Sequence, residues 1–485
     1  MRRATQFMVE RVACNGGYVW TYLADLSRRW GEMEAYPTMI WTQAPGTPEM
    51  GQLFLDAYHA TRDEYYYRAA EQAGGALMAG QHESGGWNYI IDFAGEVSLR
   101  RWYDTIGHNG WRLEELQHYY GNATFDDHVT TQCARFLLRL YLEKRDARYF
   151  APVDRAIGFV LNSQYASGGW PQRFPPAGEF RKNGRPDYTR CITLNDEVAE
   201  ENIEFLLLVL QQLGDERVHE PIRRAMDCYL LLQRPQPTPG WALQYDPETL
   251  EPAWGRSYEP RAITPHTTAA AIEKLLDFYE LTGDRKYLAR VPEALEWLVS
   301  VEAPSRAHAP DGRNFFRYVE EGTGRFIAVH RRGSNAQNGE YYVDYDMSGA
   351  RGERFVNLEA LRARVERVSA MTPEAAASNS VLFARGASLL PALVAGRGRR
   401  TADVEGLVAT LNEEGYWPSE LTSTSQPYRG DGPPVPPPGF LDRGQVGDDW
   451  DTSPFTQRPG PMGISTETYL RNMSVLIRTV AAASA

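Results

Sequence analysis

The sequence has few cysteines and no long apolar segment. Its cysteines, Cys14, Cys133, Cys191 and Cys228, are scattered along 485 residues without the spacing of a zinc site, so we expect free thiols. No apolar run approaches the ~18 residues of a transmembrane helix, and no hydrophobic segment of a signal peptide follows the basic first residues. We therefore expect no membrane partner, and a cytoplasmic protein unless a leader has been removed from a secreted or periplasmic one.

Positive charge is also in deficit. Lys and Arg number 51 against 63 Asp and Glu, which gives a net charge of −12. This balance excludes the broad positive field of a nucleic-acid binder but allows a local basic cleft for an acidic ligand. Aromatic residues are abundant, with 27 Tyr and 12 Trp. Aromatic rings stack on sugar rings and also fill protein cores, so composition alone leaves both roles open.

A repeated unit organises much of the chain. Apolar segments end at four turn aspartates, and a second amphipathic segment follows each turn, at residues 67–77, 149–161, 222–232 and 287–298. The aspartates are Asp63, Asp146, Asp215 and Asp284. A glutamine lies 18 residues beyond each of the first three, at Gln81, Gln164 and Gln233. A glycine turn and a tryptophan come next, at Trp87, Trp170 and Trp241.

This pattern predicts helical hairpins joined by long loops, with a repeat of 69 to 83 residues. Stacked hairpins share a core and can close into a ring. We therefore predict an all-α fold, an (α/α) toroid that forms a single domain over residues 1–485, with a small β-hairpin element and long loops.

The repeat weakens beyond residue 300. Residues 313–346 have the alternating aromatic pattern of an inserted β-hairpin. Residues 416–460, rich in Pro and Gly, indicate a long surface loop. Helical patterns return at four places, namely residues 357–370, 374–395, 402–413 and 467–480.

The entry into each inner helix repeats as well. A Thr or Ser precedes polar residues at 47–49, 124–127, 193–196, 264–267 and 465–467, a pattern typical of helix caps. Capping explains one acid per helix. If the hairpins run in the same sense around a ring, however, their inner N-termini meet on one face, where helix ends favour bound carboxylates. We expect Asp127, Asn195, Asp196 and His266 close together there.

Four ordered motifs, at residues 123–127, 164–172, 192–196 and 244–260, carry a resemblance to a known family. The series resembles that of the family 10 pectate lyases over roughly residues 115–335. The resemblance implies a helical toroid that cleaves polygalacturonate by β-elimination with calcium and an arginine base. The expected function is thus a polysaccharide lyase that acts on a 1,4-linked polyuronate (pectate, alginate or glucuronan) and leaves unsaturated uronate ends. The expected partner is an acidic polysaccharide or oligosaccharide.

The chemistry of β-elimination assigns roles to the motif residues. The reaction needs a neutralised carboxylate, a base for the C5 proton and a donor for the leaving oxygen. Arg256 stands where the family motif carries its base, and its alternative role is an ion pair with an acid such as Glu259. Tyr258 can donate or accept the proton, or simply pack as an aromatic residue. Asn195, at the family's amide position, completes the predicted catalytic set.

Further residues are predicted to bind the substrate or a metal. Asp127 and Asp196 match acidic positions of the family and can hold Ca²⁺ or contact the sugar. The remaining predicted substrate contacts are Trp170, Gln172, Arg173, Arg261, His266 and His118. Trp170 can instead pack in the core, as its counterparts Trp87 and Trp241 can.

The sequence departs from the family pattern at two motifs, which leaves the metal open. Residues 261–266 replace a Ser-Leu-Ser-Gly-like segment, and Arg331-Arg332-Gly333 stands where the family has Arg-Asp-Gly. One acid is lost while Arg and His are gained, so a metal-free mechanism with Asn, His, Tyr and Arg stands beside the calcium one, as in toroidal alginate or glucuronan lyases.

Other classes of protein share parts of this pattern. A glycoside hydrolase on the same toroid would use Asp127 and Asp196 as its two carboxylates. The Gln-Trp spacing also occurs in triterpene cyclases, although this chain lacks their Asp-x-Asp-Asp acid and an apolar membrane-binding segment. A ring that only binds glycans is the remaining alternative.

Overall fold

The computed structural model describes residues 1–107, 121–176, 187–256, 258–303, 313–332, 340–347, 354–383, 404–421 and 460–484. Its contacts divide the chain into two compact units. Unit 1 contains Met1–Phe159, Arg332–Gly339 and Ser388–Ala485, and unit 2 contains Val160–Arg331 and Glu340–Ala387. The sequence predicts a single domain and a ring of hairpins. Both concern how the two units fit together, so both remain predictions.

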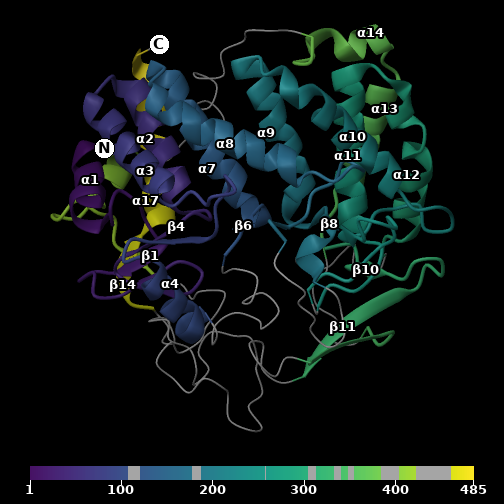
Figure 1. The fold of residues 1–485 in the computed structure, drawn as a ribbon, viewed down its shortest axis with the longest axis horizontal. Helices are drawn as coiled ribbons and strands as arrows, with labels where there is room; N and C mark the ends of the chain where they lie inside the picture. The colour runs from purple at the N-terminus through teal and green to yellow at the C-terminus, as the bar shows by residue number, and fades with distance from the viewer. Residues whose placement is uncertain are drawn as a thin grey trace. The chain divides into compact units, whose positions relative to one another are not determined.

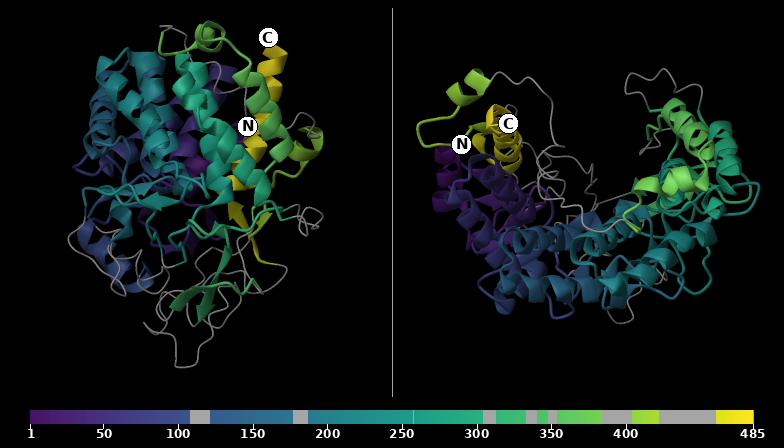
Figure 2. Two further views of the ribbon diagram at one scale, coloured as in Figure 1. Left: turned by 90° about the vertical axis from the view of Figure 1, so that its right-hand side faces the viewer. Right: turned by 90° about the horizontal axis from the view of Figure 1, so that it is seen from above.

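Unit 1 contains the first two helical hairpins. Helix α2 (Thr47–Thr61) pairs with α3 (Glu64–Ala79), and α7 (Val129–Lys144) is followed by α8 (Ala147–Ser163), whose last residues enter unit 2 (Figure 1). The C-terminal helix α17 (Thr466–Ser484) packs on α2, beside the N-terminal segment (Figure 2). The ring of Tyr469 lies 6.5 Å from that of Phe54. The helix predicted at 467–480 is therefore confirmed.

A five-stranded sheet joins the two ends of the chain within unit 1. Strand β1 (Thr21–Leu23) pairs antiparallel with β14 (Met462–Ser465), with Thr21 opposite Ser465. The strand order is β13-β14-β1-β2-β3, where β13 is Ser419–Glu420, β2 is Arg29–Trp30 and β3 is Glu34–Ala35. The sequence analysis did not predict this sheet, because two- to four-residue strands are too short to show an alternating pattern.

Shorter elements complete unit 1. They are α1 (Arg2–Phe7), a π-helical turn over Met8–Val12, β4 (Met39–Trp41) paired with β5 (Ile90–Asp92), α4 (Glu96–Trp102), β6 (Ala123–Thr124) and α16 (Val404–Ala409). The predicted helix at 402–413 is thus present in shortened form. The predicted loop at 416–460 lies largely outside the described residues.

Unit 2 contains two further hairpins. They consist of α9 (Val198–Leu213) with α10 (His219–Leu232), and α11 (Pro265–Thr282) with α12 (Val291–Ser300). Helix α13 (Leu358–Ser369) packs on α11 and confirms the helix predicted at 357–370. Of the helix predicted at 374–395, the structure describes α14 (Pro373–Ala376) and the turn to Asn379. The part of this segment beyond residue 383 lies outside the described residues.

The strands of unit 2 lie between and after these helices. Strand β7 covers Arg173–Phe174, and β8 (Ile192–Thr193) pairs with β9 (Gln244–Tyr245). The predicted insertion is a three-stranded sheet with the order β10-β11-β12, formed by Tyr318–Val319, Phe326–Arg332 and Glu340–Asp344. The β-hairpin predicted at 313–346 is therefore extended by one strand.

The four turn aspartates of the repeat cap the outer helices that follow them. Each carboxylate accepts a hydrogen bond of 3.0 Å from the backbone N–H two residues further on. This bond satisfies one of the free N–H groups at a helix start. The all-α fold of helical hairpins is thus confirmed in the described parts of both units. None of the described helices is long and apolar enough to span a bilayer, and the four cysteines are unpaired.

The repeated glutamines join each loop to the next outer helix. The Nε2 of Gln164 donates to the carbonyls of Gly168 and Pro221, each at 2.9 Å. Gln81 and Gln233 form equivalent pairs of bonds. Gly168, at a φ of +99°, lies so close to the next helix that a Cβ would be 2.1 Å from the carbonyl oxygen of Arg224. The turn therefore requires glycine, both for its backbone conformation and for space.

Candidate active site in unit 2

The inner helices α7 and α9 begin in an unusual way. Each follows a short 3₁₀ turn, Asp126–His128 and Asn195–Glu197 respectively, with two consecutive residues in the left-handed region. The φ angles are 47° and 62° at Asp127 and His128, and 50° and 58° at Asp196 and Glu197. Neither helix has a side-chain cap. The capping interpretation is therefore wrong for Asp127 and Asp196, and the repeated strain, which is uncommon for residues with a Cβ, is typical of functional sites.

Asn195 and Asp196 lie against the loop that carries Arg256. The Nδ2 of Asn195 donates to Oδ2 of Asp196 at 2.7 Å and to Oε1 of Glu259 at 3.1 Å. The Nη1 of Arg256 donates to the same two oxygens, at 3.0 and 3.1 Å. The structure thus brings together three predicted residues, Arg256, Asn195 and Asp196, around Glu259, which the sequence analysis named only as an alternative ion-pair partner.

Two local features hold this cluster. Pairing of β8 with β9 places Thr193 opposite Gln244, and the backbone N–H of Asn195 donates to the carbonyl of Leu243 at 3.1 Å. The loop around Arg256 is closed by Glu259, whose Oε2 accepts from the backbone N–H of Arg256 at 2.9 Å. A Cβ on Gly255 would lie 2.5 Å from the side-chain oxygens of Gln244 and Glu259. Only glycine fits there without displacing the cluster.

Two members of the cluster, Arg256 and Glu259, are buried, whereas Asn195 and Asp196 are half-buried, so the ion pair of the buried two is an important part of the site. Arg256 is 6% exposed and Glu259 is 1% exposed. Both carboxylates favour the charged form of the guanidinium. The ion pair of Arg256 with Glu259, the alternative considered from the sequence, is present in the structure. A role of Arg256 as base requires the substrate to displace these carboxylates first.

Positive charge surrounds the cluster in unit 2. Arg317 lies 4.0 Å from Oε1 of Glu259 and packs over the ring of Tyr318 at 5.1 Å. The hydroxyl of Tyr318 donates to the carbonyl of Tyr258 at 3.0 Å. Burial and the nearby Arg317 lower the pKa of Arg354, which in turn interacts with Asp196. Two guanidinium groups thus stand close enough to repel each other, an arrangement that a bound anion would relieve.

His266, in the first turn of α11, faces the same positive groups. Burial, with further contributions from Arg317 and Arg354, lowers the pKa of His266 to about 3, so its imidazole is neutral at ordinary pH. Its Nδ1 is buried and has no hydrogen-bond partner among the described residues. The sequence analysis named His266 but missed Arg317 and Arg354. Arg317 lies in the segment 313–346, whose pattern indicates only a β-hairpin, and Arg354 belongs to none of the four motifs.

Other predicted contacts have structural surroundings that differ from the expectation. Trp170 is fully buried, and its Nε1 donates to the carbonyl of Val160 at 2.8 Å. Trp87 and Trp241 are equally buried and form the same kind of bond. The packing alternative therefore describes Trp170, and the prediction of a sugar contact is corrected, because an enclosed indole has no face left to stack on a ring.

Gln172 and Arg173 are each 1% exposed, so they contact no ligand in this conformation. Arg261 is exposed and pairs with Glu251 at 3.3 Å and with Glu321 at 3.5 Å, carboxylates that also bind Arg234. Arg261 thus has partners outside the Arg256 cluster. His118 lies outside the described residues.

Asp127 belongs to unit 1 and has its own polar partners. Its Oδ2 accepts from Nε2 of Gln43 at 2.6 Å and from the hydroxyl of Tyr89 at 3.4 Å. The same hydroxyl donates to Asp126 at 2.5 Å. The predicted convergence of Asp127 with Asp196 concerns both units together and stays a prediction, as does a calcium ion bound by both.

The described residues around Asp196 do not by themselves fit a calcium site. Calcium takes six to eight oxygen ligands at roughly 2.3–2.6 Å, with carboxylates left free to bind it. Here Oδ2 of Asp196 and both oxygens of Glu259 already accept hydrogen bonds. The guanidinium groups of Arg256, Arg317 and Arg354 also outnumber these two carboxylates. Within unit 2, this part of the site suits an anion better than a divalent cation.

A comparison with known families supports the class of enzyme. Residues 109–269 match the model of the pectic acid lyase family. The chain is similar to the pectic acid lyases. The resemblance predicted from the motif series is confirmed by this match, and with it the enzyme class of a polysaccharide lyase. The matched segment contains Asn195, Asp196, Arg256 and Glu259.

Likeness to solved structures is remote. The family 10 polysaccharide lyase from Cellvibrio cellulosa is 15% identical, with a TM-score of 0.44 over 65% of this chain and 95% of its own. A mutant of that lyase in complex with trigalacturonic acid is also 15% identical, with a TM-score of 0.41 over 70% and 96%. The cellobiose 2-epimerase from Spirochaeta thermophila is 12% identical, with a TM-score of 0.36 over 76% and 94%. No curated protein sequence matches the chain. The lyase class therefore rests on the family match.

Proposed function

We propose that the protein cleaves a 1,4-linked polyuronate by β-elimination, with polygalacturonate as the first candidate substrate. The observation that carries the proposal is the hydrogen-bonded cluster of Asn195, Asp196, Arg256 and Glu259, which lies beside Arg317 and Arg354. A positive cluster of this kind matches the one feature that all polyuronates share, a carboxylate on every sugar.

The reaction places definite demands on these groups. A base removes the proton at C5, the C4–O bond breaks, the leaving oxygen takes up a proton, and a double bond forms between C4 and C5. The negative charge that develops next to the carboxylate is the main barrier, so fixed positive groups lower it most effectively in a water-poor site. In the proposal, Arg317 and Arg354 neutralise the carboxylate, and Asp196 and Glu259 hold Arg256 charged and oriented. Tyr258, in its ionised form, takes the C5 proton and returns it to the leaving oxygen, and Asn195 hydrogen-bonds the sugar.

The hydrolase alternative is less well supported. A general acid must carry a proton at the working pH. Asp196 instead receives hydrogen bonds from Asn195 and Arg256, and both favour the ionised carboxylate. The surroundings of Asp196 therefore suit an orienting group better than an acid.

The test is an assay panel with matched variants. The protein is incubated with polygalacturonate, alginate or glucuronan, with calcium or with a chelator, and the product is followed by ultraviolet absorbance and by reducing ends. We expect both signals to rise on a polyuronate. Arg256→Ala and Arg317→Ala should reduce the rate at least 100-fold, in the range of one lost transition-state contact (~10²–10³). Arg223→Ala, an exposed and ion-paired arginine of the same unit, should leave the rate unchanged.

Two results would contradict the proposal. New reducing ends without an absorbance rise would identify a hydrolase. Full activity of Arg256→Ala together with Arg317→Ala would place the chemistry elsewhere in the chain.

Tyr258→Phe tests the role of the Tyr258 hydroxyl. If this group transfers the proton, its loss should reduce the rate by roughly 10²–10⁴, whereas a packing role would leave the rate nearly unchanged.

A further inference from the structure

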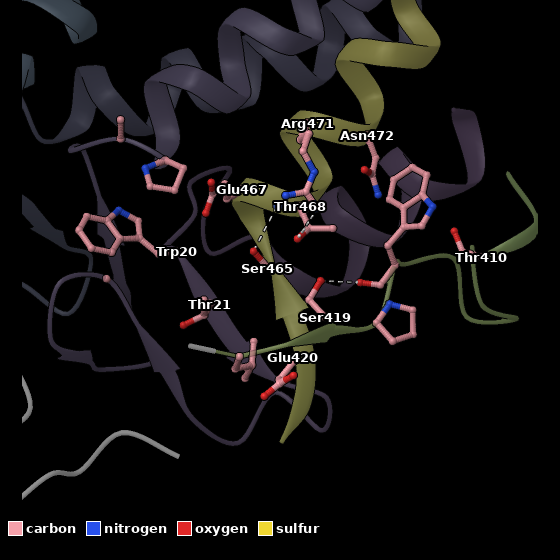
Figure 3. Close-up of a pocket in the computed structure, with 16 residues that line it drawn as sticks. Trp20, Thr21, Thr410, Ser419, Glu420, Ser465, Glu467, Thr468, Arg471 and Asn472 are labelled. Carbon is pink, nitrogen blue, oxygen red and sulfur yellow. Dashed lines mark hydrogen bonds between the residues drawn. The ribbon is translucent and has the colours of Figure 1, made fainter. Parts of the chain in front are cut away.

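A hollow lies in unit 1, away from the residues of the proposed lyase reaction in sequence. It has a volume of about 840 Å³, within the range of small-molecule sites. Its lining includes the start of β1, the segment that leads into β13, the end of β14 and the first turns of α17 (Figure 3), together with Gly31, Ala44 and Pro45. The sequence analysis treated the Ser-Thr-Glu motif at 465–467 only as one more helix start, and the proposed lyase reaction uses none of these residues.

One wall of the hollow is an aromatic platform that is held rigidly. The indole of Trp20 is partly exposed, and its Nε1 donates to the carbonyl of Gln43 at 3.0 Å. The ring lies edge-on to that of Trp41, with centroids 6.3 Å apart. The backbone of Trp20 is fixed on both sides, by Trp30 and by Thr466. A preorganised ring loses little entropy when a ligand stacks on it.

The opposite wall carries polar groups with few or no partners among the described residues. Asn472 is 8% exposed, and among the described residues no group forms a hydrogen bond with its amide. Because Asn472 lines the hollow, its amide is available to bond a ligand there. Arg471 has only a 3.4 Å contact with Thr468 and, within the part of the chain that the structure describes, no carboxylate partner. Figure 3 shows the Trp20 indole on one side of the hollow, the side chains of Arg471 and Asn472 on the other, and Glu467 between them.

The charge of the lining selects the class of ligand. Glu420 and Glu467 contribute two carboxylates against the single guanidinium of Arg471. This balance disfavours a uronate, in contrast to the positive cluster of unit 2. Carboxylates and amides are strong hydrogen-bond partners for hydroxyl groups, and the indole suits the apolar face of a pyranose. We propose that the hollow is a second carbohydrate site, which binds a neutral oligosaccharide and does not take part in the lyase reaction.

The experiment is calorimetric titration of the full chain with cellotriose, xylotriose and mannotriose, with trigalacturonate as the charged comparison. We expect at least one neutral trisaccharide to bind with one site per chain. Glu467→Ala and Asn472→Ala should each weaken that binding about tenfold or more, which corresponds to one lost hydrogen bond to a charged or buried group. Glu83→Ala, an exposed glutamate in the same unit but outside the hollow, should bind as the wild type does. The rate on polyuronates should stay within twofold in all three variants.

Three outcomes would overturn the proposal. The first is that no neutral trisaccharide binds at millimolar concentration. The second is equal binding by the Glu467→Ala, Glu83→Ala and wild-type proteins. The third is that trigalacturonate binds and loses its affinity in Glu467→Ala, which would assign the hollow to acidic sugars. Because Glu467 is exposed, we expect its variants to fold, and Glu467→Gln checks the effect of charge at nearly constant shape.

Discussion

Arg256→Ala should destabilise the protein as well as inactivate it. The substitution removes the cation that faces Glu259, which is 1% exposed. Breaking a buried ion pair by removing one partner costs about 3–5 kcal/mol. Glu259 retains hydrogen bonds from Asn195, Gln244 and the backbone N–H of residue 256, so we expect the lower end, about 3 kcal/mol.

The double variant Arg256→Ala/Glu259→Gln isolates the cause. If the uncompensated buried charge is responsible for the loss, removing it should recover about 1–2 kcal/mol relative to Arg256→Ala alone. Urea unfolding followed by tryptophan fluorescence measures both variants, and Arg223→Ala, a surface arginine, should leave the midpoint unchanged. A double variant that is no more stable than Arg256→Ala would refute the role of buried charge and leave lost packing as the reason.

Three further predictions concern the repeat and the site. Gln164→Ala removes the bonds to Gly168 and Pro221 and should lower the stability in thermal unfolding by about 2 kcal/mol. Gln211→Ala, on a helix without such bonds, should have little effect. Equal effects of the two variants would contradict the role of Gln164 in joining its loop to the next outer helix. Gly168→Ala should destabilise the protein by about 2 kcal/mol or more, because its Cβ would overlap the carbonyl of Arg224. Gly158→Ala, with open space around it, should stabilise the protein by about 0.5–1 kcal/mol. If both variants changed stability in the same direction, the steric argument would be refuted. The pKa of His266 is lowered to about 3 from its ordinary value of 6.5, so the folded state binds fewer protons than the unfolded state and stability falls as the pH drops below about 6.5. Between pH 7 and pH 5, the free energy of unfolding of His266→Gln, measured with urea, should therefore fall by about 2 kcal/mol less than that of the wild type. If the variant and the wild type showed the same pH dependence, His266 would not be held neutral.

Local chemistry allowed the sequence to predict the helical hairpins. Each turn aspartate caps the helix directly after it, and each repeated tryptophan bonds a carbonyl 10 or 12 residues earlier in the chain. Such contacts act between near neighbours and therefore recur with the spacing of the motif, although the sequence left the role of Trp170 open. The repeated glutamines combine a contact within their own loop with one to the next outer helix, and their constant distance from the turn aspartate reflected that arrangement.

The starts of the inner helices show where the sequence was misleading. A Thr followed by acids is typical of a cap, yet Asp127 and Asp196 occupy left-handed turns and bond to side chains from other segments. The backbone conformation there depends on partners such as Gln43 and Arg256, 84 and 60 residues away in the chain. Helix propensity, which acts over one turn, could not indicate this left-handed conformation.

The sequence by itself determined the helical repeat, the enzyme class through its ordered motifs, and the grouping of Asn195 and Asp196 with Arg256. Only the tertiary structure decided that Glu259 holds Arg256, that Arg317 and Arg354 add positive charge beside it, and that Trp170 is a core residue. It also decided that strands near the two ends of the chain form one sheet beside a hollow. The reason is physical. Capping and helical periodicity act between near neighbours, whereas burial and charge pairing depend on segments that only the folded chain brings together.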